Sequence, residues 1–233
     1  MKDAEGNFEI PALVAAAHEL KAPLVLLRQL SLQLQNCDDA SRCAEITRRI
    51  KLTSERSLRL VDGLSKTARL EDAMFELKPI MINGVVNEVV SEIQPLADAL
   101  NQEIRVKSRR RSVVVGHLDL IRTVLLGLLD NSLMAGTAKN KIDISFSAGR
   151  EQLVLSVRDH GQKIDRKVYR SIMSNLGHGA VGVPDRPLSS GLGLFVATRF
   201  ATYMKGSLSA VCHRRGGMTF KVSLPLSRQL ELF

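Results

Sequence analysis

The feature that most constrains the fold of this chain is the spacing of apolar residues near its start. From about residue 10 these residues recur at alternating intervals of four and three, at positions 13, 17, 20, 24 and 27. Such spacing is the heptad seam of helices that pack along one another. The segment from Asn36 to Asp39 interrupts it with turn-forming residues, and helical spacing then resumes from Ile46 to Leu64. These observations predict an antiparallel helical hairpin over residues 1–71.

Further apolar residues lie beside the seam of this hairpin. Leu26, Leu58 and Val61 fall outside the main stripe, so two helices alone leave apolar surface in water. A second hairpin buries that surface in a four-helix bundle. We therefore expect a homodimer formed through residues 10–71.

After residue 71 the pattern changes to alternating strands and helices. The segment FELKPIMI contains Pro79, which favours an edge strand, and Asn83 is expected to cap the helix that follows. Residues 141–147 and 152–159 predict a strand pair, a helix is expected to begin at Asp165, and another occupies residues 191–204 before a closing hairpin. The fold class is therefore α+β, with the helical hairpin followed by a two-layer α/β sandwich over residues 72–233.

Composition is compatible with this division and limits the location of the chain. At 233 residues and 45% hydrophobic content the chain has enough apolar residues to build cores. It has no run of 18 apolar residues and no secretory signal at its start, so we expect a cytoplasmic protein without a membrane segment. The three cysteines are an odd number without a CxxC pair, which predicts three reduced thiols and no zinc site.

The formal charge of +9 suits nucleic acid, anionic lipid or a polyanionic ligand such as a nucleotide, and does not choose among them. The densest basic run, Lys107 to Arg111, lies between two strand-like segments, which indicates a solvated turn. Neither a helix-turn-helix pattern nor a basic surface with interleaved aromatic residues accompanies this run. We therefore expect no nucleic-acid partner.

The strongest local signal for chemistry is His18 in the heptapeptide HELKAPL on the first predicted helix. Ala17 and Leu20 belong to the seam, so His18 is rotated about 100° away from Ala17 and projects from the flank of the bundle. The adjacent Glu19 can take the proton from one ring nitrogen, which leaves the other as a nucleophile toward phosphorus. Alone, a histidine on a helix surface is most often only a surface residue, so the assignment depends on the rest of the chain.

Three later segments suggest a nucleotide site. Asn131 lies on a predicted helix between its polar and apolar faces, where an amide oxygen can ligate Mg²⁺ without repelling phosphates. Asp159 ends a predicted strand before Gly161, so its carboxylate can accept a bond from an adenine amino group while the base approaches the backbone. The sequence SGLGL, residues 190–194, opens a helix after a glycine-containing stretch predicted to be a mobile loop, and its bare amides face any phosphate.

In order, these pieces resemble the His, N, G1 and G2 boxes of sensor histidine kinases, and GGMTFKVSLPL resembles the closing strand of that family. The resemblance runs from about residue 8 to residue 226 and implies a dimeric phosphotransfer hairpin, 1–71, and a Bergerat-type ATP-binding domain, 72–233. It implies ATP and Mg²⁺ as cofactors, and a response regulator receiver domain as the partner that receives the phosphoryl group on an aspartate. By matching position, the resemblance implies that His18 is the phospho-acceptor and Glu19 its acid–base neighbour. It implies that Asn131 is the Mg²⁺ ligand and Asp159 the contact to adenine. The backbone contacts to the nucleotide fall on Gly161, Gly191, Leu192 and Gly193.

The chain also departs from the family pattern. Gly127 stands where an Asn is usual and Met134 where a Lys is usual, while Lys163 replaces the second glycine of the G1 box. Lys163 either strains that turn or supplies a replacement cation to the phosphates, so it joins the expected nucleotide contacts. The fourth residue after His18 is Ala22, where the family commonly has a Thr or Asn that takes part in dephosphorylation of the partner protein. These departures leave open a degenerate kinase that serves as a dimeric scaffold for a response regulator. An ATPase clamp of the gyrase and heat-shock type is a further alternative, although HELKAPL has no role there.

Overall fold

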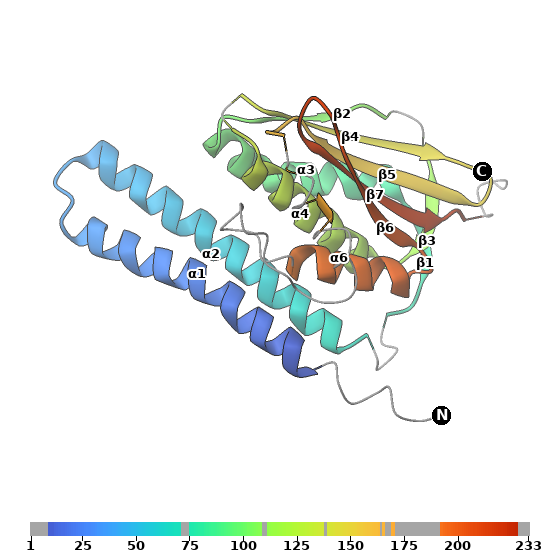
Figure 1. Ribbon diagram of the computed structural model, residues 1–233, viewed down its shortest axis with the longest axis horizontal. Helices are drawn as coiled ribbons and strands as arrows, with labels where there is room; N and C mark the ends of the chain where they lie inside the picture. The colour runs from blue at the N-terminus through green and yellow to red at the C-terminus, as the bar shows by residue number, and fades with distance from the viewer. Residues whose placement is uncertain are drawn as a thin grey trace.

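The structure is a computed structural model that describes residues 9–70, 75–108, 111–137, 139–163, 165, 169–170 and 192–227. For residues 9–16, 18 and 19 it describes the backbone only. A long helical hairpin lies against a unit of mixed helices and strands (Figure 1). The position 71–72, expected to separate two domains, lies outside the described residues.

The helical hairpin consists of α1 (Glu9–Gln35) and α2 (Ala40–Ala68). Asp39 is the N-cap of α2, and its Oδ1 accepts a hydrogen bond from the backbone nitrogen of Ser41 at 2.9 Å. A carboxylate in this position satisfies an amide that the first helical turn leaves without a partner. The two predicted helices and the turn between them are therefore confirmed.

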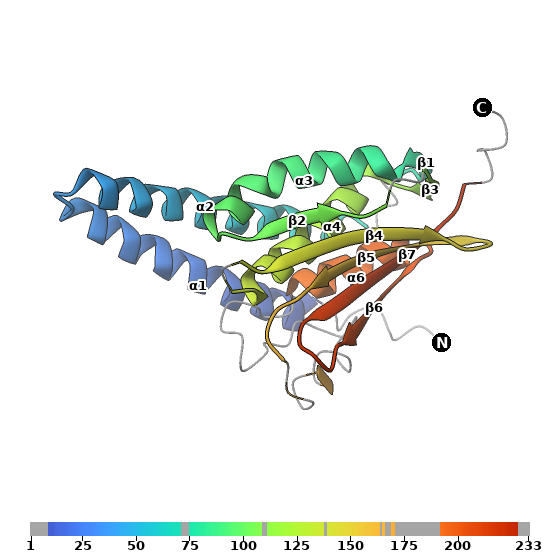
Figure 2. The same cartoon turned by 90° about the horizontal axis from the view of Figure 1, so that it is seen from above.

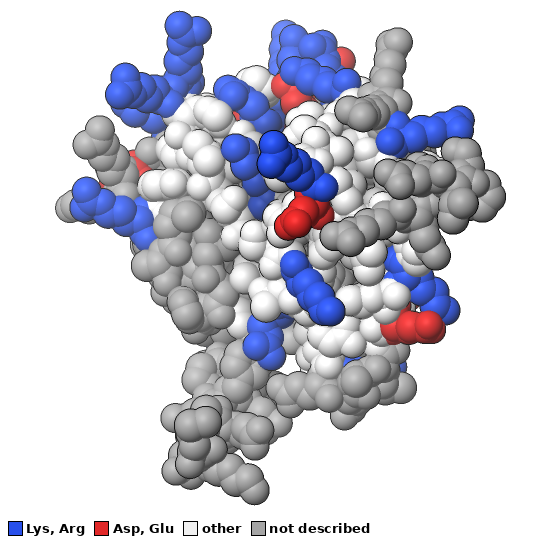
Figure 3. Space-filling view, turned by 90° about the vertical axis from the view of Figure 1, so that its right-hand side faces the viewer, with Lys and Arg blue, Asp and Glu red and all other residues white. Residues whose placement is uncertain are grey.

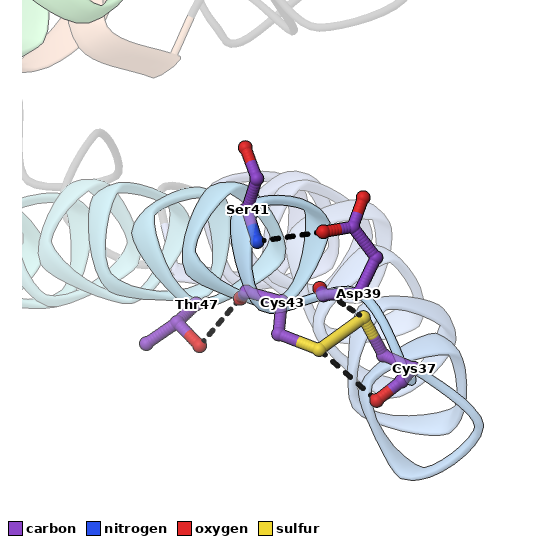
Figure 4. Close-up of a disulfide and its surroundings, with 5 residues drawn as sticks. All are labelled: Cys37, Asp39, Ser41, Cys43 and Thr47. Carbon is purple, nitrogen blue, oxygen red and sulfur yellow. Dashed lines mark hydrogen bonds between the residues drawn. A yellow bond between two sulfur atoms is a disulfide. The ribbon is translucent and has the colours of Figure 1, made fainter.

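The expectation of three reduced thiols is wrong for two of the cysteines. Cys37 and Cys43 are joined in a disulfide at the tip of the hairpin, with their Cα atoms 5.8 Å apart (Figure 4). Cys37 ends one side of the turn and Cys43 lies in the first turn of α2, so the sharp reversal brings them within bonding distance. Cys212 is free. An odd number of cysteines excludes only a complete pairing of all of them.

The remaining elements, here called the α/β unit, are β1 (Lys78–Met81), α3 (Ile82–Ala99), β2 (Glu103–Val106), β3 (Val113–Gly116), α4 (Leu118–Ala135), β4 (Lys141–Ala148), β5 (Gln152–Asp159), α6 (Leu192–Tyr203), β6 (Ser207–Cys212) and β7 (Met218–Pro225). Five strands form one sheet in the order β2-β4-β5-β7-β6, in which only the β2–β4 pair is parallel. β1 and β3 form a separate antiparallel pair, which places Pro79 in a short strand with β3 as its one partner among the described strands. The predicted antiparallel character of the sheet is confirmed.

Helices α3, α4 and α6 cover one face of the sheet, and α4 and α6 lie between the sheet and α2 (Figure 2). On β5 the buried residues alternate along the strand, so Leu153, Leu155 and Val157 point into this layer. They pack with fully buried helical residues such as Leu128 and Phe200 in one core cluster. This two-layer arrangement is the α/β sandwich that the pattern of elements predicts.

Two local expectations have a different outcome. Asn83 does not cap α3, because the helix begins at Ile82 and the Asn83 Oδ1 accepts a bond from the backbone nitrogen of Ser112 at 3.2 Å. The side chain of Ile82 is fully buried and its amide donates to the Ser112 carbonyl at 3.0 Å, so the pairing of β1 with β3 continues into the start of the helix. The helix expected from Asp165 and the loop at 175–190 lie largely or wholly outside the described residues.

Basic side chains occupy several separate places on the face of the molecule drawn in Figure 3. On the face in Figure 3, Lys and Arg side chains outnumber Asp and Glu but are scattered rather than joined into one stripe. Within the basic run of the sequence, Lys107 pairs with Asp143 at 2.7 Å, and Ser108 bonds to the backbone of Phe146. The described part of this run is therefore anchored to the edge of the sheet.

Candidate functional site

The candidate site is built around the second half of α4. Leu128, Leu129 and Leu133 are buried in the core, and their packing leaves Asn131 half-buried at the margin of the helix. A methyl group added to Gly193, at the start of α6, would lie 3.6 Å from Nδ2 of Asn131. The expected Mg²⁺ ligand and the expected phosphate-binding helix start are therefore adjacent, although 62 residues separate them in the sequence.

Asp159, at the end of β5, is fully buried and held by two backbone amides. Its Oδ1 accepts a bond from the amide of Gly161 at 3.0 Å, and its Oδ2 accepts one from the amide of Met218 at 3.2 Å. Two such bonds hold the carboxylate in one orientation, because each oxygen keeps a separate partner. The side chain is thereby fixed between the Gly161 turn and the start of β7.

The turn after Asp159 is pressed against the end of α4. A methyl group added to Gly161 would lie 3.0 Å from both the carbonyl oxygen of Ala135 and Oδ1 of Asp159. That spacing leaves no room for a side chain without displacement of the backbone, which explains glycine at this position. Since Asn131 lies one turn before Ala135 on the same helix, the ends of β5 and α4 and the start of α6 converge on one region.

The turn between β6 and β7 closes over the same region, a contact that was not predicted from the sequence. Gly216 and Gly217 both adopt positive φ, at 100° and 76°, and the amide of Gly217 donates to the carbonyl of Gln162 at 3.1 Å. A methyl group on Gly217 would lie only 2.1 Å from the carbonyl oxygen of Asp159. The glycine pair in GGMTFKVSLPL was a visible signal for a tight turn, but the sequence could not show what the turn contacts.

Two of the unusual residues differ in accessibility. Met134 is partly buried and packs against the core, so an apolar contact occupies the position where the family usually has a lysine. The side chain of Lys163 is exposed, while its backbone nitrogen lies near the glycine turn, 3.2 Å from a methyl group built on Gly216. The ammonium of Lys163 is therefore accessible to a ligand at the edge of this turn.

Behind the turn, a small charged cluster connects it to the neighbouring strand. Nε2 of His160 lies 2.8 Å from Oδ2 of Asp143, which also accepts a bond from Lys107 at 2.7 Å. Burial of Asp143 opposes its ionisation, but the hydrogen bonds from Lys107 and His160 outweigh that effect and lower the pKa of this carboxyl below its usual value. His160, between Asp159 and Gly161, thereby fastens the turn to β4.

The other expected site residues are only partly described. His18 and Glu19 lie in α1, of which the backbone alone is described there, and α1 contacts α6. Gly191 lies outside the described residues. The side chain of Leu192 is fully buried, so this residue can offer a ligand only its backbone.

The chemistry of the region fits a nucleotide with Mg²⁺ better than a metal held by protein alone. Among the described residues no group of three or more His, Cys, Asp or Glu side chains could hold a metal ion. Mg²⁺ characteristically takes one or two protein oxygens and completes its shell with phosphate oxygens and water. Asn131 carries one amide oxygen beside the start of α6, and Asp159 carries a carboxylate held in one orientation, so the residues present fit such a ligand.

A family model matches the part of the chain that contains these elements. Residues 116–228 match the family described as histidine kinase-, DNA gyrase B-, and HSP90-like ATPase. The matched segment includes α4, β5, α6 and the closing strand, which are the elements that converge on the candidate site.

Curated relatives extend the similarity over the hairpin. The chain is 25% identical over 213 residues to the sensor protein CutS of Streptomyces coelicolor, covering 91% of this chain and 51% of CutS. It is 29% identical over 231 residues to the sensor protein KdpD of Escherichia coli, covering 94% of this chain and 25% of KdpD. The chain thus spans about half or less of the length of these two relatives.

Solved structures share the fold. The histidine kinase AdeS of Acinetobacter baumannii superimposes with a TM-score of 0.61 at 18% identity, covering 91% of this chain and 98% of that one. The histidine kinase ThkA, solved in complex with the response regulator protein TrrA, gives a TM-score of 0.58 at 18% identity, covering 91% of this chain and 60% of that one.

Within the described part of this chain, none of the helices has the length and apolar character needed to span a membrane.

Proposed function

We propose that this chain, a homologue of the sensor histidine kinases, is a catalytic core that phosphorylates its own His18 from ATP and passes the phosphoryl group to an aspartate of a response regulator receiver domain. The observation that carries the proposal is the convergence of Asn131, Asp159 and Gly193 in one region of the α/β unit, against which a histidine-bearing hairpin is packed. The proposal divides the chain into a phosphotransfer hairpin, 1–71, and an ATP-binding domain, 72–233.

In this proposal the residues of the α/β unit bind and orient the nucleotide. Asp159 accepts a hydrogen bond from the adenine amino group, and Gly161 allows the base to approach the backbone. The amides of Gly191, Leu192 and Gly193 and the positive end of the α6 dipole face the phosphates. Bound at Asn131, Mg²⁺ supplies neutralisation of the charge that develops on the phosphates.

The hairpin supplies the acceptor. Glu19 takes the proton from one ring nitrogen of His18, and the other nitrogen attacks the γ-phosphorus in line with the leaving oxygen. A nitrogen–phosphorus bond forms as the bond between the γ-phosphorus and the bridging oxygen breaks, and ADP leaves. Catalysis of this kind depends mainly on positioning and electrostatics, because the protein forms no other covalent bond.

The proposed function also includes a homodimer formed through the hairpin. Leu58 and Val61, expected beside the seam, are exposed by 65% and 45% in the single chain, whereas Leu26, expected there too, is half-buried. Leu24, expected in the seam, is instead 58% exposed and adds to this apolar surface. Burial of such residues against a second copy is favourable by roughly 1.5–3 kcal/mol for each fully buried side chain. The four-helix bundle formed in this way supports a dimer with two copies of His18.

A degenerate kinase that acts as a scaffold is the second candidate, and one observation favours it. Gly127 has no side chain to offer, and Met134 packs against the core, so neither provides the polar and cationic contacts usual in the family. The exposed ammonium of Lys163 is then the residue that could compensate at the phosphates. An ATPase clamp is less well supported, because nothing in that activity requires the histidine-bearing hairpin.

Incubation with γ-labelled ATP and Mg²⁺ tests these alternatives. A kinase acquires acid-labile, base-stable label, an ATPase releases free phosphate only, and a scaffold does neither.

We expect His18→Gln to abolish labelling without loss of nucleotide binding, and Asn131→Asp to abolish labelling because it adds a negative charge beside the phosphates. Asn87→Asp, on the exposed face of α3, is the matched control and should label normally. Acid-labile label on His18→Gln would exclude His18 as the acceptor.

A further inference from the structure

The hairpin and the α/β unit are joined by an ion pair next to the proposed Mg²⁺ ligand. Arg59 of α2 donates to both carboxylate oxygens of Asp130 on α4, at 3.1 and 3.0 Å. The two side chains are only 22% and 10% exposed. A two-point contact of this kind fixes direction as well as distance, because Nε and Nη2 of Arg59 must each face one carboxylate oxygen of Asp130.

A second polar contact between the same helices has the same register. Nζ of Lys66, which also pairs with Asp62, lies 3.4 Å from Oγ1 of Thr123. From Arg59 to Lys66 is a step of seven residues forward along α2, and from Asp130 to Thr123 is a step of seven back along α4. The helices therefore run antiparallel, with matched contacts about 10 Å apart along their axes.

Gly63, between the two contacts, allows the helices to approach closely. A methyl group added to it would lie 3.3 Å from Cγ1 of Val196 on α6 and 3.6 Å from Cγ2 of Thr123 on α4. Any longer side chain at this position would push α2 away from both helices. The register between α2 and α4 is thus determined by two polar contacts and one close approach.

This register sets the height of the nucleotide site along the hairpin. His18 lies 17 residues before the end of α1, and Ser57 lies 17 residues after the start of α2, so the antiparallel hairpin places them at about the same level. Arg59 is only two residues further on, a rise of about 3 Å. Its partner Asp130 is the neighbour of Asn131, so the proposed metal ligand and the proposed acceptor stand at similar heights.

We propose that Arg59 and Asp130 are positioning residues for the phosphoryl transfer, which hold the nucleotide site at the level of His18 along the hairpin. This inference rests on the proposed kinase function. A slip of one helical turn would displace the site by about 5.4 Å, beyond the separation of about 3–3.5 Å required for attack. In a bundle whose two-fold axis is parallel to the helices, the partner's histidine stands at the same height, so the role holds for transfer within or between chains.

The test measures the rate of His18 labelling and the affinity for a non-hydrolysable ATP analogue in four proteins: wild type, Arg59→Ala, Asp130→Ala and the double variant. We expect the labelling rate of Arg59→Ala to fall about tenfold to a hundredfold, with analogue affinity changed by less than about twofold. Lys51→Ala removes an exposed cation from the same helix, where its Nζ lies 3.9 Å from Oε1 of Glu55, and should label like wild type.

The double variant separates positioning from a structural effect. If Arg59→Ala is slow only because a buried carboxylate has lost its partner, removal of Asp130 as well should restore the rate, and that recovery would overturn the proposal. An Arg59→Ala protein that labels faster than wild type would also overturn it, because the contact would then restrain the reaction. A double variant as slow as Arg59→Ala supports the positioning role.

Thermal unfolding of the same four proteins gives a readout that requires no activity. If the ion pair forms in solution, the shifts in Tm of the single variants should not add, and the discrepancy should be about 2–4 °C. Additive shifts would show that the contact is absent and would overturn the register. Absence of label on wild-type protein would instead reject the kinase function, and with it the positioning role, whatever the unfolding coupling shows.

Discussion

The hairpin and the α/β unit differ in how completely each buries its apolar residues. On the hairpin, Leu58 and Val61 remain 65% and 45% exposed, while Leu30 and Ile46 are among the few apolar side chains that are buried. The α/β unit instead contains a continuous core from α3 to β7, to which all three of its described helices contribute. The part with the proposed acceptor histidine therefore leaves apolar surface that a second copy could bury, whereas the part with the proposed nucleotide site has a core of its own.

The largest expected effect is loss of the proposed dimer when the exposed apolar surface of the hairpin is changed. Leu58→Asp places a carboxylate in the proposed interface, and a cost of about 3 kcal/mol would weaken dimerisation at least a hundredfold. Light scattering over a range of concentrations should show a shift from dimer to monomer. Leu118→Asp, at a 45% exposed position of the α/β unit, is the matched control and should stay dimeric. A wild-type chain that is monomeric at all concentrations would contradict the contrast.

The next effect concerns the turn that closes over Asp159. Gly217→Ala introduces a methyl group 2.1 Å from the Asp159 carbonyl oxygen at a residue with φ of 76°, so the turn must move. We expect a loss of about 1–3 kcal/mol in the free energy of unfolding and weaker binding of an ATP analogue. Gly84→Ala, in α3 with nothing within 4 Å, should instead stabilise the protein by about 0.5–1 kcal/mol. Unchanged analogue binding in Gly217→Ala would show that the turn does not position Asp159.

The disulfide gives an effect of similar size in the hairpin. Cys37 and Cys43 are six residues apart, and the loss of chain entropy in a loop this short corresponds to about 2 kcal/mol of stability. We expect Cys37→Ser to lower Tm while leaving nucleotide affinity unchanged, because the disulfide is at the tip of the hairpin. Cys212→Ser is the control. Equal unfolding of wild type with and without dithiothreitol would argue that the bond does not form in solution.

The smallest expected effect is a dependence of the α/β unit on pH. His213 contacts Arg158 and Thr219, and burial followed by the charge of Arg158 lowers its pKa below the ordinary value of 6.5. The unfolded chain then binds the proton more readily, so stability is full above pH 6.5 and declines as pH falls toward the folded pKa. His213→Gln should reduce the difference in Tm between about pH 7.5 and about pH 5.5. A difference as large as in wild type would assign the dependence to other groups.

Much of the fold follows from local patterns in the sequence. The heptad spacing and the turn chemistry at Asn36 to Asp39 predicted the two helices, because both depend on residues close in the chain. The alternation in β4 and β5 predicted an antiparallel pair for the same reason. Asn83 was misassigned because a capping residue and a residue that accepts a bond from a distant amide look alike in sequence.

The candidate site was predictable as a set of residues but not as an arrangement. The order of HELKAPL, Asn131, Asp159 and SGLGL identified which residues to consider, and their roles stay predictions until tested by mutation. The hydrogen bond from the backbone amide of Met218 to Oδ2 of Asp159 joins residues 59 positions apart, and no periodicity in the sequence reports such a contact.

The sequence by itself determined the elements, their order and the chemical character of each motif, since those depend on period, turn residues and side-chain type. Only the tertiary structure decided which distant residues meet. It joined Cys37 to Cys43, which a count of cysteines had argued against, and it brought the glycine turn onto Asp159. It also set the register of Arg59 against Asp130, because that register depends on how two separately formed helices approach at Gly63. Packing in three dimensions selects these contacts from the many that the same sequence would allow.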